Sequence, residues 1–182
     1  MVAAAVIIDR GYAECGEASL LLDGLTDSKK LSAKKRTKFF SVLMESPHIK
    51  IGVGLVDAET IDEMNILQAT HKAMALAVDD LPVKPDFVLV DGLPVKTFPC
   101  ESKSIVGGDS KSLSIAAASV IAKVVRDEHM LVLDQTYPDY GFAKHKGYGT
   151  QLHIENLFEF GPCPEHRYSF RPVREAEKMR AL

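Results

Sequence analysis

An aspartate stands at the end of a predicted buried strand. Asp91 directly follows the apolar run Phe87–Val90 and precedes Gly92. The carboxyl ends of strands border the site crevice in open α/β sheets, so a carboxylate at this position is well placed to hold a metal ion. A turn at Asp91-Gly92 explains the same residues equally well. Two interpretations of Asp91 are therefore open, a metal ligand and a turn residue.

A second aspartate, Asp127, occurs late in the longest predicted helix, which runs from Ser112 to about Leu133. This helix is rich in small residues at Ala116–Ser119, which allow another backbone to come close, and we expect it to pack against a sheet. Asp127 stands four residues after Lys123. Taken alone, a solvated i,i+4 ion pair is the simpler interpretation of these two residues.

The segment His145–Thr150, with the sequence His-Lys-Gly-Tyr-Gly-Thr, combines a basic residue, a tyrosine and two glycines. Glycine lets a backbone approach a ligand, and Tyr148 can stack and donate one hydrogen bond. A structural loop is the alternative. The six histidines of the chain show no HExxH or paired spacing, which argues against zinc. A Ser-centred elbow, a P-loop and a GxGxxG motif are also absent from the sequence.

Positive charge is concentrated in two stretches although the net charge is −3. No acid occurs between Asp27 and Glu45, and a second basic stretch follows near the C-terminus. A local basic surface can hold phosphates whatever the total charge. A solvated helix face is the simpler interpretation of the charge alone. The cations of the two stretches are Lys29, Lys30, Lys34, Lys35, Arg36 and Lys38, then Lys144, Lys146, Arg167, Arg171 and Arg174.

The elements that would position these residues alternate between strand and helix. Apolar patterns predict strands at residues 2–8, 49–56, 87–90 and 103–106, whereas residues 9–24 are turn-like. Apolar spacing predicts helices at 61–81, 112–133 and 150–158, and another from the N-cap Ser32 to about Glu45. A tail follows from Gly161. This order predicts an α/β sandwich in a single domain, residues 1–182.

Length and composition exclude several classes of protein. The 182 residues are 46% hydrophobic and 26% charged, which is typical of a folded domain and not of a disordered or fibrous chain. The longest uncharged run, Ser112–Ala122, is too short to cross a bilayer. The start lacks the basic region of a signal peptide. Because Cys15, Cys100 and Cys163 are odd in number and widely spaced, we expect a reducing cytoplasm.

Several segments together are similar to bacterial ribonuclease HII, a type 2 ribonuclease H family. They follow the family's order and cover essentially the whole chain. The matching segments are Gly24–Ser32, Glu59–Leu67, Leu89–Gly92, Ser114–Asp127, Tyr137–Phe142, His145–Thr150 and His166–Phe170. The resemblance implies an RNase H-like fold, in which helices flank a central mixed sheet and a helical extension follows at the C-terminus.

The resemblance also implies an activity. The family hydrolyses the RNA strand of RNA·DNA hybrids and cuts at ribonucleotides embedded in duplex DNA, leaving 5′-phosphomonoesters, in ribonucleotide excision repair and DNA replication. By motif match, Asp91 and Asp127 are the third and fourth of its four acids. They would bind Mn²⁺ or Mg²⁺, and two such ions would activate water and stabilise the leaving oxygen. Tyr148 matches the tyrosine that stacks at the ribonucleotide junction, where the 2′-OH is sensed.

The looser part of the resemblance concerns nucleic-acid contacts. Lys29, Lys30 and Asn65 fall in segments that contact the nucleic-acid backbone in the family. The implied partners are an RNA·DNA hybrid and a DNA duplex containing ribonucleotides. We expect no membrane association and a monomeric protein.

One motif of the family is absent. Its first strand carries Asp-Glu-x-Gly-Arg-Gly, which supplies the other two acids, and it precedes the strand that here is Val2–Ile8. Asp9-Arg10-Gly11 is no substitute, because it follows that strand. Gly107 also replaces a lysine that is frequent in the family. We therefore expect the chain as given to be nearly inactive and marginally stable, and the upstream coding DNA to continue in frame with such a strand.

Two other hypotheses are open. One is an N-terminally truncated, catalytically silent form of the same fold that still binds hybrids. The other is a different RNase H-like nuclease or a structural α/β protein. Ribonuclease HIII fits less well, because no additional substrate-binding domain precedes the motifs. Metal-dependent cutting of a duplex with one ribonucleotide separates an active enzyme from the silent form.

Overall fold

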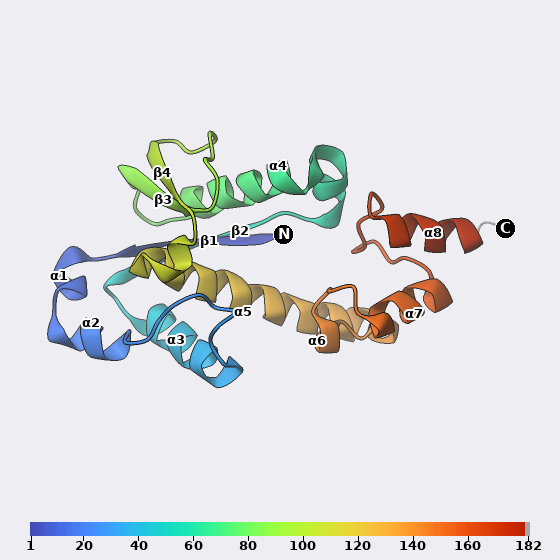
Figure 1. The fold of residues 1–182 in the computed structure, drawn as a ribbon, viewed down its shortest axis with the longest axis horizontal. Coiled ribbons are helices and arrows are strands. Elements are labelled where there is room, and N and C mark those ends of the chain that lie inside the picture. Colours follow the sequence, from blue (N-terminus) through green and yellow to red (C-terminus); the bar gives the residue numbers. More distant parts are fainter. Residues whose placement is uncertain (181–182) are drawn as a thin grey trace. The chain divides into compact units, whose positions relative to one another are not determined.

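The computed structural model describes residues 1–180, apart from the side chains of residues 17–19. The chain divides into two compact units. The strand unit comprises Val2–Leu55 and Thr70–Val124, and the helical unit comprises Met1, Val56–Ala69 and Val125–Leu182. Two helices, α4 (Ala58–Asp79) and α5 (Leu113–Thr136), contribute residues to both units, and Figure 1 shows both.

Four strands in the strand unit form two separate ladders. β1 (Val2–Ile8) pairs antiparallel with β2 (Ile49–Leu55), and β3 (Phe87–Asp91) pairs in parallel with β4 (Glu101–Ile105). The predicted strands are confirmed, and β3 extends one residue further to include Asp91. Within the described residues, no ladder joins β1 to β3. The antiparallel and parallel pairings of a mixed sheet are thus both present, but they belong to two separate two-stranded sheets.

The predicted helices are confirmed with shifted ends. α3 begins after Ser32, whose side chain accepts the Lys35 N–H as predicted for an N-cap. α7 begins after Thr150, whose hydroxyl accepts the His153 N–H. α4 is kinked at Asn65. The bounds of these two helices are Ala33–Glu45 for α3 and Gln151–Phe160 for α7. Three short helical segments lie beside them in the chain order: η1 (Gly108–Ser110), η2 (Pro138–Tyr140) and α6 (Phe142–His145).

Two segments without predicted helices are helical. The turn-like stretch 9–24 contains α1 (Arg10–Ala13) and α2 (Gly16–Leu21), which are too short for apolar periodicity to reveal. The predicted C-terminal tail contains α8 (Arg171–Arg180). Its apolar residues Val173 and Ala176 lie three apart and are buried. The prediction missed α8 because only these two positions mark its buried face.

Helix α4 packs directly on β2 at two glycines. A Cβ on Gly52 would overlap the Ala77 carbonyl oxygen, and a Cβ on Gly54 would overlap that of Ala73. Ala73 and Ala77 are themselves fully buried. Any side chain at either glycine would therefore push the helix off the strand. The Gly-x-Gly spacing in β2 serves this close packing.

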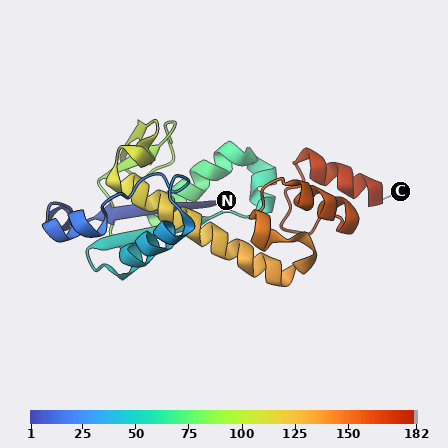
Figure 2. The same ribbon diagram turned by 60° about the horizontal axis from the view of Figure 1, so that its bottom comes forward.

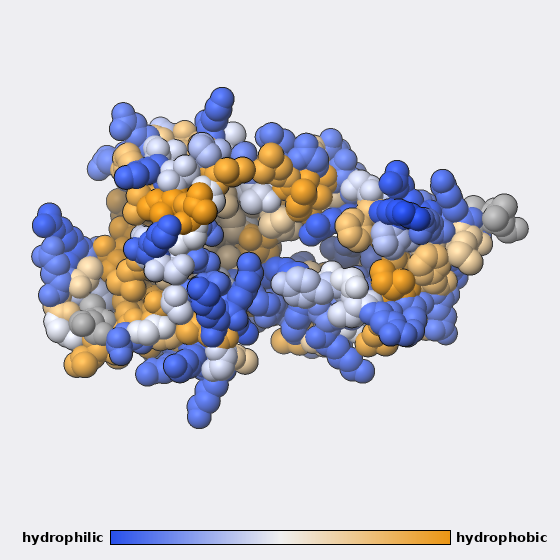
Figure 3. Space-filling model, in the orientation of Figure 1, coloured by the Kyte–Doolittle hydropathy of each residue, from blue (hydrophilic) through white to orange (hydrophobic). Residues whose placement is uncertain are grey.

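An apolar cavity of about 730 Å³ opens in the strand unit. It is lined by every residue of β1 and of β3, and by the first turns of α5. Apolar surface gathers around this region in Figure 3. Phe87 and Leu89 of β3 border the cavity and are 48% and 40% exposed. Large apolar side chains exposed beside a hollow indicate that this part of the core is incompletely filled.

The helical unit has two small cores. One consists of Leu133, Tyr140, Phe142 and Cys163, and the other packs α7 against α8, which lie side by side in Figure 2. The Tyr140 hydroxyl donates to the Gly161 carbonyl (2.8 Å), which ties η2 to the end of α7. Among the described residues, no helix combines the length and the apolar character needed to span a bilayer.

Candidate functional site

Asp127 lies in the helical unit among cations. Its carboxylate, about a quarter exposed, is 3.9 Å from the Arg126 guanidinium. The Lys146 ammonium lies 3.5 Å from the Asp127 carbonyl oxygen. Arg126 also donates to the Lys146 carbonyl (2.7 Å). Asp127 is therefore set within a positively charged neighbourhood that an anionic ligand could share.

Tyr148 presents its ring next to this cluster. The guanidinium carbon of Arg126 lies 4.8 Å from the centre of the ring, which is a cation–π contact. The residue is 54% exposed. One face of the ring is thus backed by a cation while much of the ring stays accessible. An exposed aromatic ring held by a cation is suited to stacking against a sugar or base.

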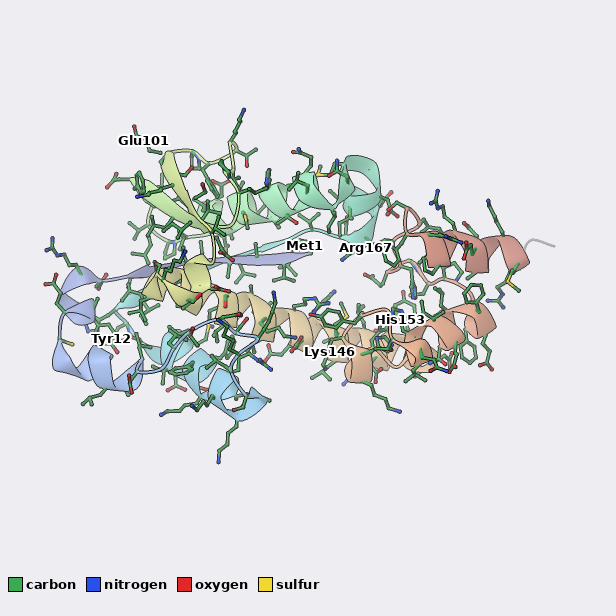
Figure 4. All side chains as sticks on the ribbon, viewed as in Figure 1. Met1, Tyr12, Glu101, Lys146, His153 and Arg167 are labelled. Atoms are coloured by element: carbon green, nitrogen blue, oxygen red, sulfur yellow. The ribbon has the colours of Figure 1, made fainter. Side chains whose placement is uncertain are left out.

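The backbone next to Tyr148 adopts an unusual conformation. Lys146 has φ 51° and Gly147 has φ 76°, so two consecutive residues are left-handed. A left-handed conformation costs a lysine energy, so contacts with the surrounding structure must hold it there. The Arg126 bond to the Lys146 carbonyl is one such restraint. Figure 4 labels Lys146 in this loop and His153 on α7.

Arg167 adds a further cation in the helical unit. Burial and the nearby Arg126 charge lower the pKa of Arg167, and the Asp62 carboxylate partly opposes that shift. The same Asp62 carboxylate accepts the backbone N–H groups of Tyr168 and Ser169, the latter at 3.0 Å. Arg126 and Arg167 are thus two partly buried cations of the helical unit, close enough for the charge of one to affect the other.

Asp91 lies in the strand unit at the end of β3, as predicted. Its Oδ1 accepts the Gly108 N–H (2.8 Å), and Asp91 borders the apolar cavity. The Gly92 N–H donates to Ile105 of β4 (3.1 Å). A Cβ on Gly108 would lie 3.5 Å from the Asp91 oxygen and closer still to Ile115. The close approach of this loop thus fixes the orientation of the carboxylate.

Lys29 and Lys30 are exposed on a well-anchored loop of the strand unit. The Lys29 N–H donates to the Asp27 carboxylate (2.9 Å), and the buried Ser28 N–H donates to the Ser119 hydroxyl of α5 (3.1 Å). Arg36 binds the Ser28 carbonyl. The backbone is therefore fixed while both lysine side chains reach solvent, which suits contacts with phosphates.

Asn65, in the helical unit, forms the kink in α4. It has φ 72°, a conformation that asparagine tolerates better than most residues. Its Oδ1 accepts the N–H groups of Leu67 (3.0 Å) and Gln68 (3.1 Å), so it caps the second part of the helix. The residue is exposed. Asn65 thus has a structural role that the sequence motif did not reveal.

The carboxylates fit a divalent metal in kind, but their number is small. Hard cations such as Mg²⁺ and Mn²⁺ take oxygen ligands, which Asp91 and Asp127 offer. Within residues 1–180, no group of three or more His, Cys, Asp and Glu side chains is arranged to hold a metal ion. Each of these carboxylates can therefore supply only part of a metal's ligands.

The predicted site residues fall into two sets. Asp127, Tyr148 and Asn65 belong to the helical unit, where Arg126 and Lys146 connect Asp127 with Tyr148. The other set, Asp91, Lys29 and Lys30, belongs to the strand unit. The sequence interpretation did not single out Arg126, although it directly precedes Asp127 in a matched segment.

Comparison with known proteins identifies the family. The family model described as ribonuclease HII matches residues 1–173. A ribonuclease HII of Chlamydia abortus is 51% identical over 176 residues, 96% of this chain and 78% of that protein. One from Chlamydia muridarum is 54% identical over 154 residues, 84% of this chain and 70% of that protein.

Solved structures agree on the fold. The ribonuclease H2 of Pyrococcus horikoshii superposes with a TM-score of 0.78 at 24% identity, covering 98% of both chains. The ribonuclease HII in the PCNA:RNase HII complex of Archaeoglobus fulgidus gives 0.69 at 23% identity, covering 92% of this chain and 85% of that one. The expected RNase H-like fold is confirmed. With a family model over nearly its whole length and relatives about half identical to it, this chain belongs to the ribonuclease HII family.

Proposed function

We propose that this protein is an endoribonuclease that hydrolyses the RNA strand of RNA·DNA hybrids and cuts at ribonucleotides embedded in duplex DNA. One observation carries the proposal beyond the family name. The exposed ring of Tyr148 is backed by Arg126, which also lies beside the Asp127 carboxylate. An aromatic ring that could stack on the nucleic acid thus lies near an acid that could hold a metal ion. Cleavage beside a recognised sugar requires the recognising group and the metal-binding acid to be close together.

The proposal assigns a separate task to each group. Tyr148 packs on the sugar at the ribonucleotide junction, while Lys29, Lys30 and the exposed amide of Asn65 contact the backbone. Asp91 and Asp127 would each offer carboxylate oxygens to Mn²⁺ or Mg²⁺, and such ions, when bound, would activate water and stabilise the leaving oxygen. Hydrolysis would then leave a 5′-phosphomonoester. We propose further that the protein acts as a single RNase H-like domain, as a monomer in the cytoplasm, in ribonucleotide excision repair and DNA replication.

The test is cleavage of a DNA duplex with one ribonucleotide, with an all-DNA duplex as control. It uses the chain itself and a form preceded by a strand with the Asp-Glu-x-Gly-Arg-Gly motif. We expect Mn²⁺- or Mg²⁺-dependent cutting by the longer form and little by the chain itself. If neither form binds or cuts the ribonucleotide-containing duplex, the proposal is wrong.

A catalytically silent, hybrid-binding form is the second candidate. The observation that favours it is that no three His, Cys, Asp or Glu side chains among the described residues are grouped to hold a metal ion. It predicts that a fluorescent RNA·DNA hybrid binds both forms with equal affinity and that neither form cuts it with either metal. Binding without cutting would support this candidate over the first.

A further inference from the structure

Three histidines and a cysteine form one network behind the Tyr148 loop, in which His153, His166 and Cys163 are linked by hydrogen bonds and His145 joins by stacking on His153. His145, His153, His166 and Cys163 are all buried, each with less than 9% of its surface exposed. The rings of His145 and His153 stack with centres 4.1 Å apart. His153 Nε2 lies 3.1 Å from His166 Nε2, and His166 Nδ1 lies 3.1 Å from both the backbone nitrogen and the sulfur of Cys163.

The partners of His153 and His166 fix where their protons lie. The Tyr148 carbonyl, 2.9 Å from His153 Nδ1, can only accept, so this nitrogen carries the proton. His153 Nε2 is then an acceptor, and His166 Nε2 must donate to it. His166 Nδ1 is therefore an acceptor for the Cys163 N–H. Each ring is neutral, with one nitrogen donating and one accepting.

His145 is fixed in the same way. Its Nε2 lies 2.8 Å from the Tyr140 carbonyl, which can only accept, so Nε2 carries the proton. Its Nδ1 accepts the Gly147 N–H (3.1 Å). A second proton on His145, His153 or His166 would place an N–H against another N–H. The network accommodates neutral rings alone.

The network binds the loop at the atoms that orient Tyr148. His145 binds the Gly147 N–H and His153 binds the Tyr148 carbonyl. From the other side, Arg126 binds the Lys146 carbonyl and contacts the Tyr148 ring. These contacts hold the two left-handed residues that precede Tyr148 and leave its ring exposed.

We propose that His145, His153 and His166 are positioning residues, which together hold the Tyr148 ring in the orientation that meets the nucleic acid. What Tyr148 does there rests on the proposed function, whereas how it is held does not. Loss of the His153 bond frees the Tyr148 carbonyl and lets the ring reorient. The consequence is weaker binding at the ribonucleotide junction, with the hydrolytic step itself unaffected.

Neutral rings are expected at neutral pH. Burial, and to a smaller extent the neighbouring histidines, lower the pKa of both His153 and His166, that of His166 to about 4. The other titratable or charged groups facing the network are Tyr140, Tyr168 and Glu165, with Arg180 of α8 beyond Tyr140. Burial raises the pKa of Cys163, so its thiol is also neutral.

Residue 148 can be observed directly, because the chain contains no tryptophan. In a Tyr148→Trp protein, fluorescence anisotropy reports the mobility of this side chain without any substrate. We expect the anisotropy to fall when His153→Phe is added. It should stay unchanged with His129→Phe, which makes the same substitution at an exposed histidine of α5. Equal anisotropy in all three proteins, with helical circular dichroism intact, would overturn the proposal.

A second measurement needs no variant. Nitrogen-15 NMR of the imidazole rings at pH 7 should show the proton on Nδ1 of His153 and on Nε2 of His145 and His166. A proton on Nε2 of His153 would overturn the proposal, because the Tyr148 carbonyl would then lack its donor. This readout keeps the proposal testable if His153→Phe does not fold.

Binding and cleavage separate this inference from the proposed function. In the longer form that carries the Asp-Glu-x-Gly-Arg-Gly strand, His153→Phe should raise KM for a duplex with one ribonucleotide by about tenfold, with kcat little changed. It should add nothing in a Tyr148→Ala background. Equal effects of His153→Phe in both backgrounds would overturn the positioning role. If Tyr148→Ala leaves KM unchanged while the anisotropy responds as expected, the positioning role is supported and the junction role of Tyr148 is wrong.

Discussion

At the scale of single residues, we expect the Tyr148 ring to act on the nucleic acid and to contribute little to folding. It is 54% exposed and touches Arg126 through its face. In a form that cleaves, we expect Tyr148→Ala to weaken cleavage at a single embedded ribonucleotide by about tenfold or more, because a stacking contact contributes about 1–3 kcal/mol. Cleavage rates and thermal unfolding of the same preparation check this. Tyr148→Phe, which keeps the ring, is the matched control, and an unchanged rate in Tyr148→Ala would make Tyr148 a structural residue.

Asp91 permits a second residue-scale prediction. Its Oδ1 accepts the Gly108 N–H, and an asparagine can keep that bond through its amide oxygen while losing the charge that a metal needs. Asp91→Asn, in a form that cleaves, should therefore abolish cleavage while largely sparing binding of the duplex and the fold. Binding of Mn²⁺, followed by its electron paramagnetic resonance, should weaken in parallel. Normal turnover in this variant would show that Asp91 is a turn residue and not a metal ligand.

At the scale of elements, the kink in α4 depends on one side chain. Asn65 Oδ1 caps the second part of the helix, so Asn65→Ala should cost about 1 kcal/mol of unfolding free energy. Asn65→Asp keeps the capping oxygen but replaces the amide donor with negative charge. We expect it to retain stability and to bind nucleic acid more weakly than the parent protein. Urea unfolding and hybrid binding test the pair, and equal binding by the parent and Asn65→Asp would exclude a backbone contact from this side chain.

The buried histidines make the packing of the C-terminal elements sensitive to acid. The pKa of His166 falls from 6.5 to about 4 on folding, because burial disfavours its charged form. Between these values the unfolded chain binds more protons, so stability is full above pH 6.5 and declines as the pH falls toward about 4. The loss attributable to His166 is at most about 3 kcal/mol. Urea midpoints at several pH values should show a smaller decline for His166→Gln than for the parent, and an equal decline would contradict this assignment.

Local signals predicted the elements better than the contacts between them. The Ser32 cap, the β-branched run of β1 and the strand-end position of Asp91 each depend on a few neighbouring residues, and all three were confirmed. The capping role of Asn65 and the histidine network were not predicted. The Asn65 cap is local, but it depends on a break in α4 that the apolar spacing of the helix does not mark. The histidine network depends on atoms brought together by packing, such as those of His153 and His166, thirteen positions apart. Spacing along the chain carries no signal for such a pair.

At the scale of the whole molecule, the cavity in the strand unit motivates the last prediction. Its walls are β1 and β3, which each pair on one side only within the described residues, and Phe87 and Leu89 are exposed beside it. An additional extended segment between these strands would pair with both edges and cover apolar surface.

We expect that placing about 20 residues before Met1, enough for a strand of about six residues ending in Asp-Glu-x-Gly-Arg-Gly and its loop, raises the unfolding temperature and brings metal-dependent cleavage. The matched control carries Asn-Gln in place of Asp-Glu, and should gain the stability without the cleavage. Robust cleavage by the chain without any such segment, or no stabilisation by either extension, would show that this view of the cavity and of the acids is wrong.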